Sequence, residues 1–198
     1  MQPGKRFLVV ACTLVALATA ATAALAASGS QNAGAASPKK SRIDVVHLKL
    51  TPSSDQLAKC MPGAQLNVDV GLTTDKIGFD LFRITARHLP PNRSFTVFLL
   101  EQAGSPFGAA EYIGDVDTNK YGNGQNTFRL IVQEAFSSTL VGGSRVRVDL
   151  NRIGSWFADP ADDDFCLGPN SPVTPFDGDN EAGVQAFNSA NADPLPAP

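Results

Sequence analysis

The stretch QLNVDVGL at residues 65–72 alternates strictly between polar and apolar side chains. Successive side chains of a β-strand point to opposite faces, so the apolar residues share one face and the polar residues share the other. A strand with one apolar and one polar face is typical of an antiparallel sheet that covers a core on one side. The stretch therefore predicts a half-buried antiparallel strand.

Further segments on both sides of this stretch also predict strands, because they are rich in Val, Ile, Leu and Phe and end at turn signals. These segments are 43–50, 77–86, 94–100, 111–117, 127–134 and 145–150. Residues 132–140 could form either a helical turn or a bent strand. About seven short strands without a long helical pattern predict an all-β fold, an antiparallel β-sandwich.

The segment FRITARHLPPNRSFTVFL at residues 82–99 combines a strand, a Leu-x-Pro type of turn and an aromatic-x-Val strand. It resembles part of an immunoglobulin-like or fibronectin type III domain, and the chain looks like uncharacterised secreted bacterial proteins built on one such module. The resemblance implies an immunoglobulin-like sandwich and an exported protein. It implies no particular activity, because one fold hosts many functions.

The two ends of the chain differ in composition from the middle. Residues 1–26 have a basic start, an apolar run and a small-x-small ending, which predict a cleaved signal peptide, with a retained membrane anchor as the alternative. Residues 27–41 are small and polar and predict a flexible spacer. The β-sandwich domain is expected at 42–167. Residues 168–198 are Pro-rich and acidic, and we expect a tail that wraps the surface or stays mobile.

Charge and cysteine content restrict the partners and the compartment. The chain has 16 basic and 19 acidic residues, a net charge of −3, which argues against nucleic-acid binding through bulk positive charge. Loss of the leader removes Cys12 and leaves Cys60 and Cys166, an even number that predicts a disulfide in an oxidising compartment. Two free thiols are the alternative. We expect a secreted protein, extracellular, periplasmic or associated with the cell surface, that makes no membrane contact after leader cleavage.

One segment has the spacing of calcium ligands. Asp115, Asp117 and Asn119 place oxygen-bearing side chains at alternate positions, as calcium loops do. The rest of an EF-hand is missing, because Lys120 stands where the loop needs glycine and Asn126 where it needs a bidentate glutamate. A hairpin turn is the other interpretation of this segment. Calcium is thus the one candidate cofactor.

An acidic cluster and the histidines give weaker signals. Asp159 and residues 162–164 could hold a cation, but such a run is more typical of a solvated loop. The chain has two histidines, His47 and His88, and no Gly-x-Ser-x-Gly nucleophile motif. We therefore assign no catalytic residue.

These observations favour a secreted, non-catalytic β-sandwich module that binds an extracellular protein or a component of the cell envelope. One alternative is a calcium-dependent extracellular adhesion or binding protein. Another is a secreted hydrolase without a recognisable motif. In the favoured case the functional residues are expected in turns carried by a rigid scaffold.

Overall fold

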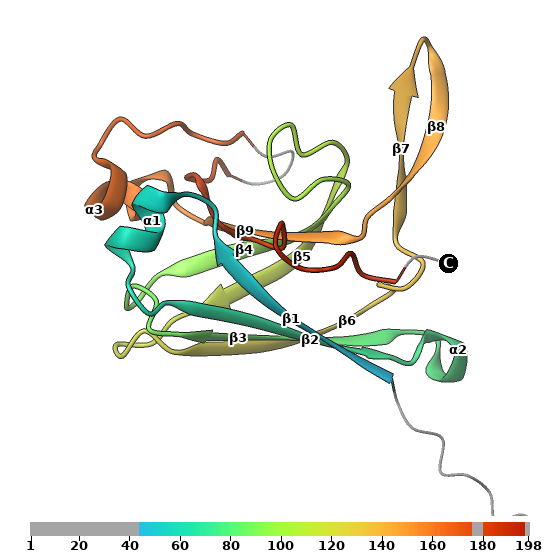
Figure 1. Ribbon diagram of the computed structural model, residues 1–198, viewed down its shortest axis with the longest axis horizontal. Helices are drawn as coiled ribbons and strands as arrows, with labels where there is room; N and C mark the ends of the chain where they lie inside the picture. Colours follow the sequence, from blue (N-terminus) through green and yellow to red (C-terminus); the bar gives the residue numbers. More distant parts are fainter. Residues whose placement is uncertain (1–43, 176–179, 197–198) are drawn as a thin grey trace, which may run out of the picture. The chain divides into compact units, whose positions relative to one another are not determined.

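The computed structural model describes residues 44–175 and 180–196 (Figure 1). The strands are β1 (Asp44–Pro52), β2 (Gln65–Leu72), β3 (Asp80–Arg87), β4 (Ser94–Leu100), β5 (Ala110–Asp117), β6 (Gly124–Leu130), β7 (Phe136–Val141), β8 (Ser144–Asp149), β9 (Arg152–Phe157) and β10 (Gln185–Asn188). The short helices are α1 (Asp55–Cys60), α2 (Thr74–Ile77), η1 (Pro160–Asp163) and α3 (Asp164–Leu167). The expected signal peptide at 1–26 and spacer at 27–41 lie outside the described residues.

The expected antiparallel all-β fold is confirmed. Eight strands form one sheet in the order β5-β4-β9-β10-β1-β2-β3-β6, while β7 and β8 pair with each other. The large sheet curls so that its two end strands come together, and Nδ2 of Asn126 in β6 donates a hydrogen bond to the carbonyl oxygen of Asp115 in β5 at 2.8 Å. The sheet is therefore nearly closed into a barrel.

Strand β1 connects the two parts of this sheet. Residues 44–50 pair with β2, whereas Thr51 and Pro52 pair with β10. The inward side chains of both parts meet in one core, whose fully buried members include Leu66, Val68, Val70, Phe82, Ile84, Phe95, Val97, Phe157 and Phe187. Burial of this apolar surface is the main contribution that favours folding.

The outer side of β4 and β9 is covered as well. Phe98 and Trp156 point away from the main core and form a second cluster with Leu100 and Ala182. The ring of Phe107, in the segment between β4 and β5, lies 5.0 Å from the ring of Trp156. This part of the sheet is thus buried on both sides, which explains the nearly continuous apolar sequence of β4 and β9.

The C-terminal segment corrects the expected domain boundary at 167/168. Residues 185–188, assigned from the sequence to a tail, form β10 between β1 and β9, and all four are buried. Strand β9 was also missed by the sequence analysis. Both strands are short, and their buried residues do not alternate with exposed ones, so a period of two was not visible.

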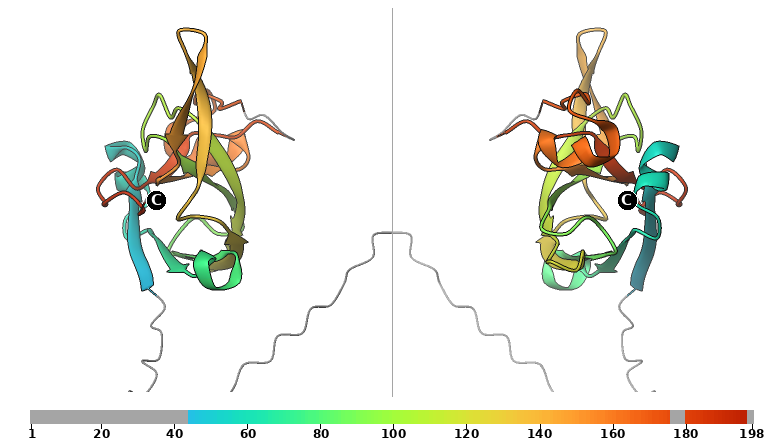
Figure 2. Two further views of the ribbon diagram at one scale, coloured as in Figure 1. Left: turned by 90° about the vertical axis from the view of Figure 1, so that its right-hand side faces the viewer. Right: turned by 90° about the vertical axis from the view of Figure 1, so that its left-hand side faces the viewer.

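The β7–β8 hairpin accounts for the ambiguous segment 132–140. Residues 136–141 are a strand, and the two-residue turn Gly142-Gly143 has φ values of 57° and 85°. Positive φ at both positions is what a type I′ hairpin turn requires, and glycine adopts it without strain. The hairpin projects away from the large sheet (Figure 2).

The helices of the described ranges are all short. None of them is long and apolar enough to cross a membrane.

Candidate binding surface

The outer side of β1, β2, β3 and β6 is a polar sheet face. Because these strands are in register, their outward side chains lie in rows that cross the sheet. One row is His47, Asp69, Arg83 and Thr127, and the next is Lys49, Asn67, Thr85 and Gln125. Gln65 lies opposite Arg87, and Leu81 lies opposite Arg129. We call these residues, together with Val45 and Gly71, the outer face.

The outer face is open to solvent. Its charged side chains, other than the half-buried Asp69, are exposed. The opposite side of the same strands packs into the core, so the alternation predicted for residues 65–72 extends across the layer. This openness contrasts with the β4–β9 region, where the segment around Phe107 covers the outer side.

The outer face is positively charged although the chain as a whole is acidic. It carries the cations Lys49, Arg83, Arg87 and Arg129 and one carboxylate, Asp69. The Asp69 carboxylate accepts a hydrogen bond from Nδ1 of His47 at 2.6 Å. Within residues 44–175 and 180–196, the three cations Lys49, Arg83 and Arg87 take part in no ion pair. Their charges are therefore available to a ligand.

A depression of about 550 Å³ lies at one end of the outer face. It is lined by polar side chains of β3, β6 and the turn between β5 and β6, which are Thr85, Arg87, Asn119, Asn123 and Gln125. These groups offer guanidinium, amide and hydroxyl hydrogen-bonding atoms. No carboxylate or histidine lines the depression, so its described lining has no general base.

The turn that borders the depression is held by a close backbone contact. Gly122 has a φ of 72°, and a Cβ atom at this position would lie 2.0 Å from the carbonyl oxygen of Leu89. The amide of Leu89 donates to the carbonyl oxygen of Gly122 at 3.1 Å. Only glycine permits both the backbone conformation and this approach. The turn that borders the depression is therefore fixed against the residues that follow β3.

The predicted calcium ligands lie along β5 and this turn. Oδ1 of Asn119 accepts hydrogen bonds from the backbone amides of Tyr121 and Asn123, at 2.8 and 3.2 Å, as expected for the hairpin interpretation. Oδ2 of Asp115 accepts a hydrogen bond from the hydroxyl of Tyr112 at 3.1 Å, while Asp117 is exposed. Two of the three candidate ligands thus already accept hydrogen bonds.

The acidic cluster has structural roles. Asp159 accepts from the backbone amide of Ala161 at 2.8 Å and caps η1, and Asp162 forms an ion pair with Arg93. Asp163 is fully buried and accepts from Ser171 and from the amide of Val184, which joins η1 to the C-terminal segment. Among the described residues, no group of three or more His, Cys, Asp or Glu side chains could hold a metal ion. Interpreting the cluster as a solvated loop was therefore wrong for Asp163.

The electrostatics of Asp162 follow from this packing. Burial raises the pKa of the Asp162 carboxyl, and the nearby Asp159 and Asp163 add to the effect. The Arg93 guanidinium lowers the pKa of Asp162, but by less than burial and the neighbouring carboxylates raise it.

A buried carboxylate was missed by the sequence analysis. Asp80, at the start of β3, has no exposed surface, and its oxygens accept four backbone hydrogen bonds. The donors are the amides of Thr73, Thr74, Val132 and Gln133, at 2.7 to 3.0 Å. Asp80 thus joins the start of α2 to the segment after β6. Burial alone would raise the pKa of this carboxyl, but the four amide hydrogen bonds outweigh it and lower the pKa.

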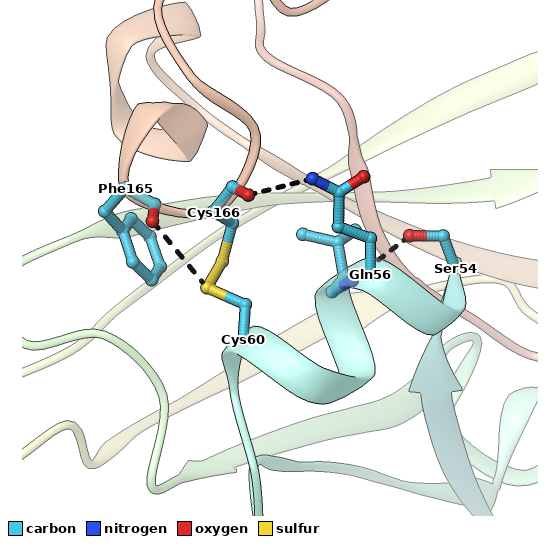
Figure 3. The surroundings of a disulfide bond; sticks show 6 residues. Ser54, Gln56, Cys60, Phe165 and Cys166 are labelled. Atoms are coloured by element: carbon cyan, nitrogen blue, oxygen red, sulfur yellow. Dashed lines mark hydrogen bonds between the residues drawn. A yellow bond between two sulfur atoms is a disulfide. The ribbon is translucent and has the colours of Figure 1, made fainter.

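The predicted disulfide between Cys60 and Cys166 is confirmed (Figure 3). It joins the end of α1 to α3, and the Gln56 side chain reinforces the junction by donating to the carbonyl oxygen of Cys166 at 3.1 Å. The two cysteines are 106 positions apart in the sequence. A crosslink over such a long loop strongly restricts the unfolded chain.

We expect loss of this disulfide to destabilise the domain. The Cys60→Ser/Cys166→Ser variant should lose about 2–4 kcal/mol of unfolding free energy, because the unfolded chain regains loop freedom. Urea unfolding of both proteins, with and without dithiothreitol, measures the effect. Reductant should lower the stability of the parent protein to that of the variant and leave the variant unchanged. Equal stability of the parent and the variant without reductant would contradict the prediction.

The cations of the outer face were not identified from the sequence. They occupy polar positions in predicted strands, or next to one in the case of Arg87, but which strands lie side by side is not encoded locally. The structure shows this order, which places residues up to 80 positions apart in the chain, such as Lys49 and Arg129, on the same face of the sheet. Comparison of the chain with family models, curated proteins and solved structures finds no match.

Proposed function

We propose that this protein is a secreted, non-catalytic binding module that contacts a component of the cell envelope or the extracellular medium through its outer face. The observation that carries the proposal is the open, positively charged outer face of β1, β2, β3 and β6, which ends in a polar depression. The proposal includes export and the cleaved leader. It also takes the two halves of the curled sheet, which β1 connects, as the two layers of the immunoglobulin-like sandwich that the resemblance implies. The Cys60–Cys166 disulfide supports it, because disulfides persist in oxidising compartments.

The residues around the depression favour binding over hydrolysis. Hydrolytic catalysis needs a nucleophile or an activated water beside a base. The depression instead presents amide, hydroxyl and guanidinium groups. The His47–Asp69 pair lies on the exposed sheet face, in a row with Arg83 and Thr127. These features support a surface that holds a ligand by hydrogen bonds and charge.

The test is retention on cell-surface material from the protein's own organism. The mature chain (residues 27–198), an Asn67→Trp variant and a Ser138→Trp variant are incubated with that material, and the bound fraction is measured. Asn67 lies in the middle of the outer face, so a bulky side chain there should abolish retention. Ser138 is exposed on the β7–β8 hairpin, so Ser138→Trp should be retained like the parent. No retention of the parent, or equal retention of all three proteins, would contradict the proposal.

A calcium-dependent module is the second candidate function, and one observation favours it. Oδ1 of Asp115 is buried and has no hydrogen-bond partner among the described residues, so this oxygen is free to bind a cation. In that case about 1 mM calcium should raise the melting temperature, and Asp115→Asn should remove the increase. An unchanged melting temperature of the parent in calcium would exclude this alternative.

A further inference from the structure

We infer that the ligand of the outer face is an acidic polysaccharide, a glycan chain that carries carboxylate groups. The inference rests on the proposed function, because it assigns a chemical class to the ligand of the same face. Three features of the face carry it: the excess of cations, the neutral hydrogen-bonding groups between them, and outward strand positions that carry no row of aromatic side chains and few apolar ones.

The excess of cations selects an anionic ligand. Arg83 and Arg87 are four positions apart on β3, so their Cα atoms are about 13 Å apart along the strand. Lys49 lies two strands away, and Arg129 lies on the neighbouring strand β6. Asp69, which is the one carboxylate on the face, accepts a hydrogen bond from His47. Cations spaced along and across the strands suit a polymer with repeated negative charges better than a single small anion.

The groups between the cations select a polyhydroxylated ligand. Gln65, Asn67, Thr85, Gln125 and Thr127 lie between or beside the cations on the same face. Their amides and hydroxyls can donate and accept hydrogen bonds, which matches sugar hydroxyls. Arginine adds a planar donor pair that fits a carboxylate with two parallel hydrogen bonds. Arg87 lies both on the face and in the wall of the depression, so a sugar ring seated there can place its carboxylate against this side chain.

The outer face is less suited to the other common polyanions. Single-stranded nucleic acid binds to a series of aromatic side chains on which successive bases stack. Among the outward side chains of β1, β2, β3 and β6, the imidazole of His47 is the one ring. Phe79 packs against Arg129, and Tyr121 is exposed in the turn that borders the depression, so the face and its border offer no row of rings for successive bases. A membrane surface is bound by apolar side chains that enter the lipid together with cations. Val45 and Leu81 are the apolar side chains of the face, and both lie in the row at the far end from the depression.

The test measures the affinity of the mature chain for four probes by isothermal titration calorimetry or biolayer interferometry. The probes are polygalacturonate, neutral dextran, a single-stranded DNA oligonucleotide and phosphatidylglycerol vesicles. We expect binding to polygalacturonate, weaker binding to DNA and vesicles, and no binding to dextran. Raising NaCl from about 0.05 to about 0.5 M should weaken the polygalacturonate complex, because salt screens its charges.

Two double variants show whether binding depends on the cations of the outer face or only on the net charge of the protein. Arg83→Ala/Arg87→Ala should weaken polygalacturonate binding at least about tenfold, because two charge-assisted contacts are lost. Arg145→Ala/Arg147→Ala removes the same charge from the exposed β7–β8 hairpin and should leave the affinity within about twofold. Gln125→Ala, which keeps the net charge, should weaken binding to polygalacturonate more than binding to DNA.

The remaining outcomes overturn the inference. No polygalacturonate binding, equal affinity for DNA or vesicles, or an equal loss in both double variants would each contradict an acidic glycan as the ligand. The proposed function fails separately, because retention on surface material is measured with the native ligand present. Retention on surface material without binding to polygalacturonate would support the proposed function and contradict an acidic glycan as the ligand.

Discussion

Replacing Phe187 with alanine is expected to destabilise the domain by about 3–5 kcal/mol, which is the usual cost of a large cavity in a core. Phe187 lies in β10 and is completely buried. Its ring is 6.4 Å from that of Phe95, which in turn is 5.1 Å from the ring of Phe157. The lost side chain therefore leaves a void beside Phe95 in the core, where the close-packed neighbours can collapse only by moving the sheet.

Phe136→Ala is the matched control for this substitution. It removes the same side chain from β7, where the ring is 57% exposed, and should cost less than about 1 kcal/mol. Urea unfolding curves followed by circular dichroism give both free energies. If Phe187→Ala were as stable as Phe136→Ala, residues 185–188 would not complete the sheet.

Replacing Asp80 with asparagine is expected to cost about 3 kcal/mol or more at neutral pH. The carboxylate accepts four backbone hydrogen bonds, and each of its oxygens accepts two of them. An asparagine amide has one acceptor oxygen, so its NH₂ group faces two backbone amides that are then left without an acceptor. Each unsatisfied buried donor costs about 1–3 kcal/mol. Asp75→Asn, an exposed change in the adjacent helix α2, should have no measurable effect.

The same carboxylate predicts how stability depends on pH. The pKa of Asp80 is lower in the folded protein than its ordinary value of 3.8, so the folded state favours the charged form. The contribution is fully present above the ordinary pKa and is lost as the pH falls through the lower pKa of the folded state. The difference in stability between the parent and Asp80→Asn should therefore be constant near neutral pH and shrink below about pH 4. A difference that stays constant down to pH 2 would contradict this assignment.

The local part of the fold could be predicted from the sequence, and its long-range part could not. Residues 65–72 alternate in the structure as predicted, because one face of β2 meets the core and the other meets solvent. Asp80 gave no signal, because its four donors come from segments up to 53 positions away. The Cys60–Cys166 disulfide could be predicted, because two cysteines allow only one intramolecular pairing.

The candidate site shows the same division. His47, Asn67 and Asp69 could be assigned to polar strand faces from alternation alone. The sequence does not show that β3 lies between β2 and β6, which is what brings Arg83 and Arg87 beside Gln125 and Asn67. The functional residues were expected in turns, and Asn119 and Asn123, which line the depression, lie in a turn. The larger part of the candidate surface is a regular sheet face.

The position of β10 between β1 and β9 has a consequence for the order of events during biosynthesis. A polypeptide that emerges N-terminus first from a ribosome or a translocation channel releases β1 and then β9 before residues 185–188 follow. Until then β1 has no neighbour on the side that faces β9, and the pairing of β1 with β10 spans almost the entire length of the domain. Such distant contacts form slowly. Under the proposed export of the chain in extended form, this delay would keep the translocated part unfolded until β10 has followed.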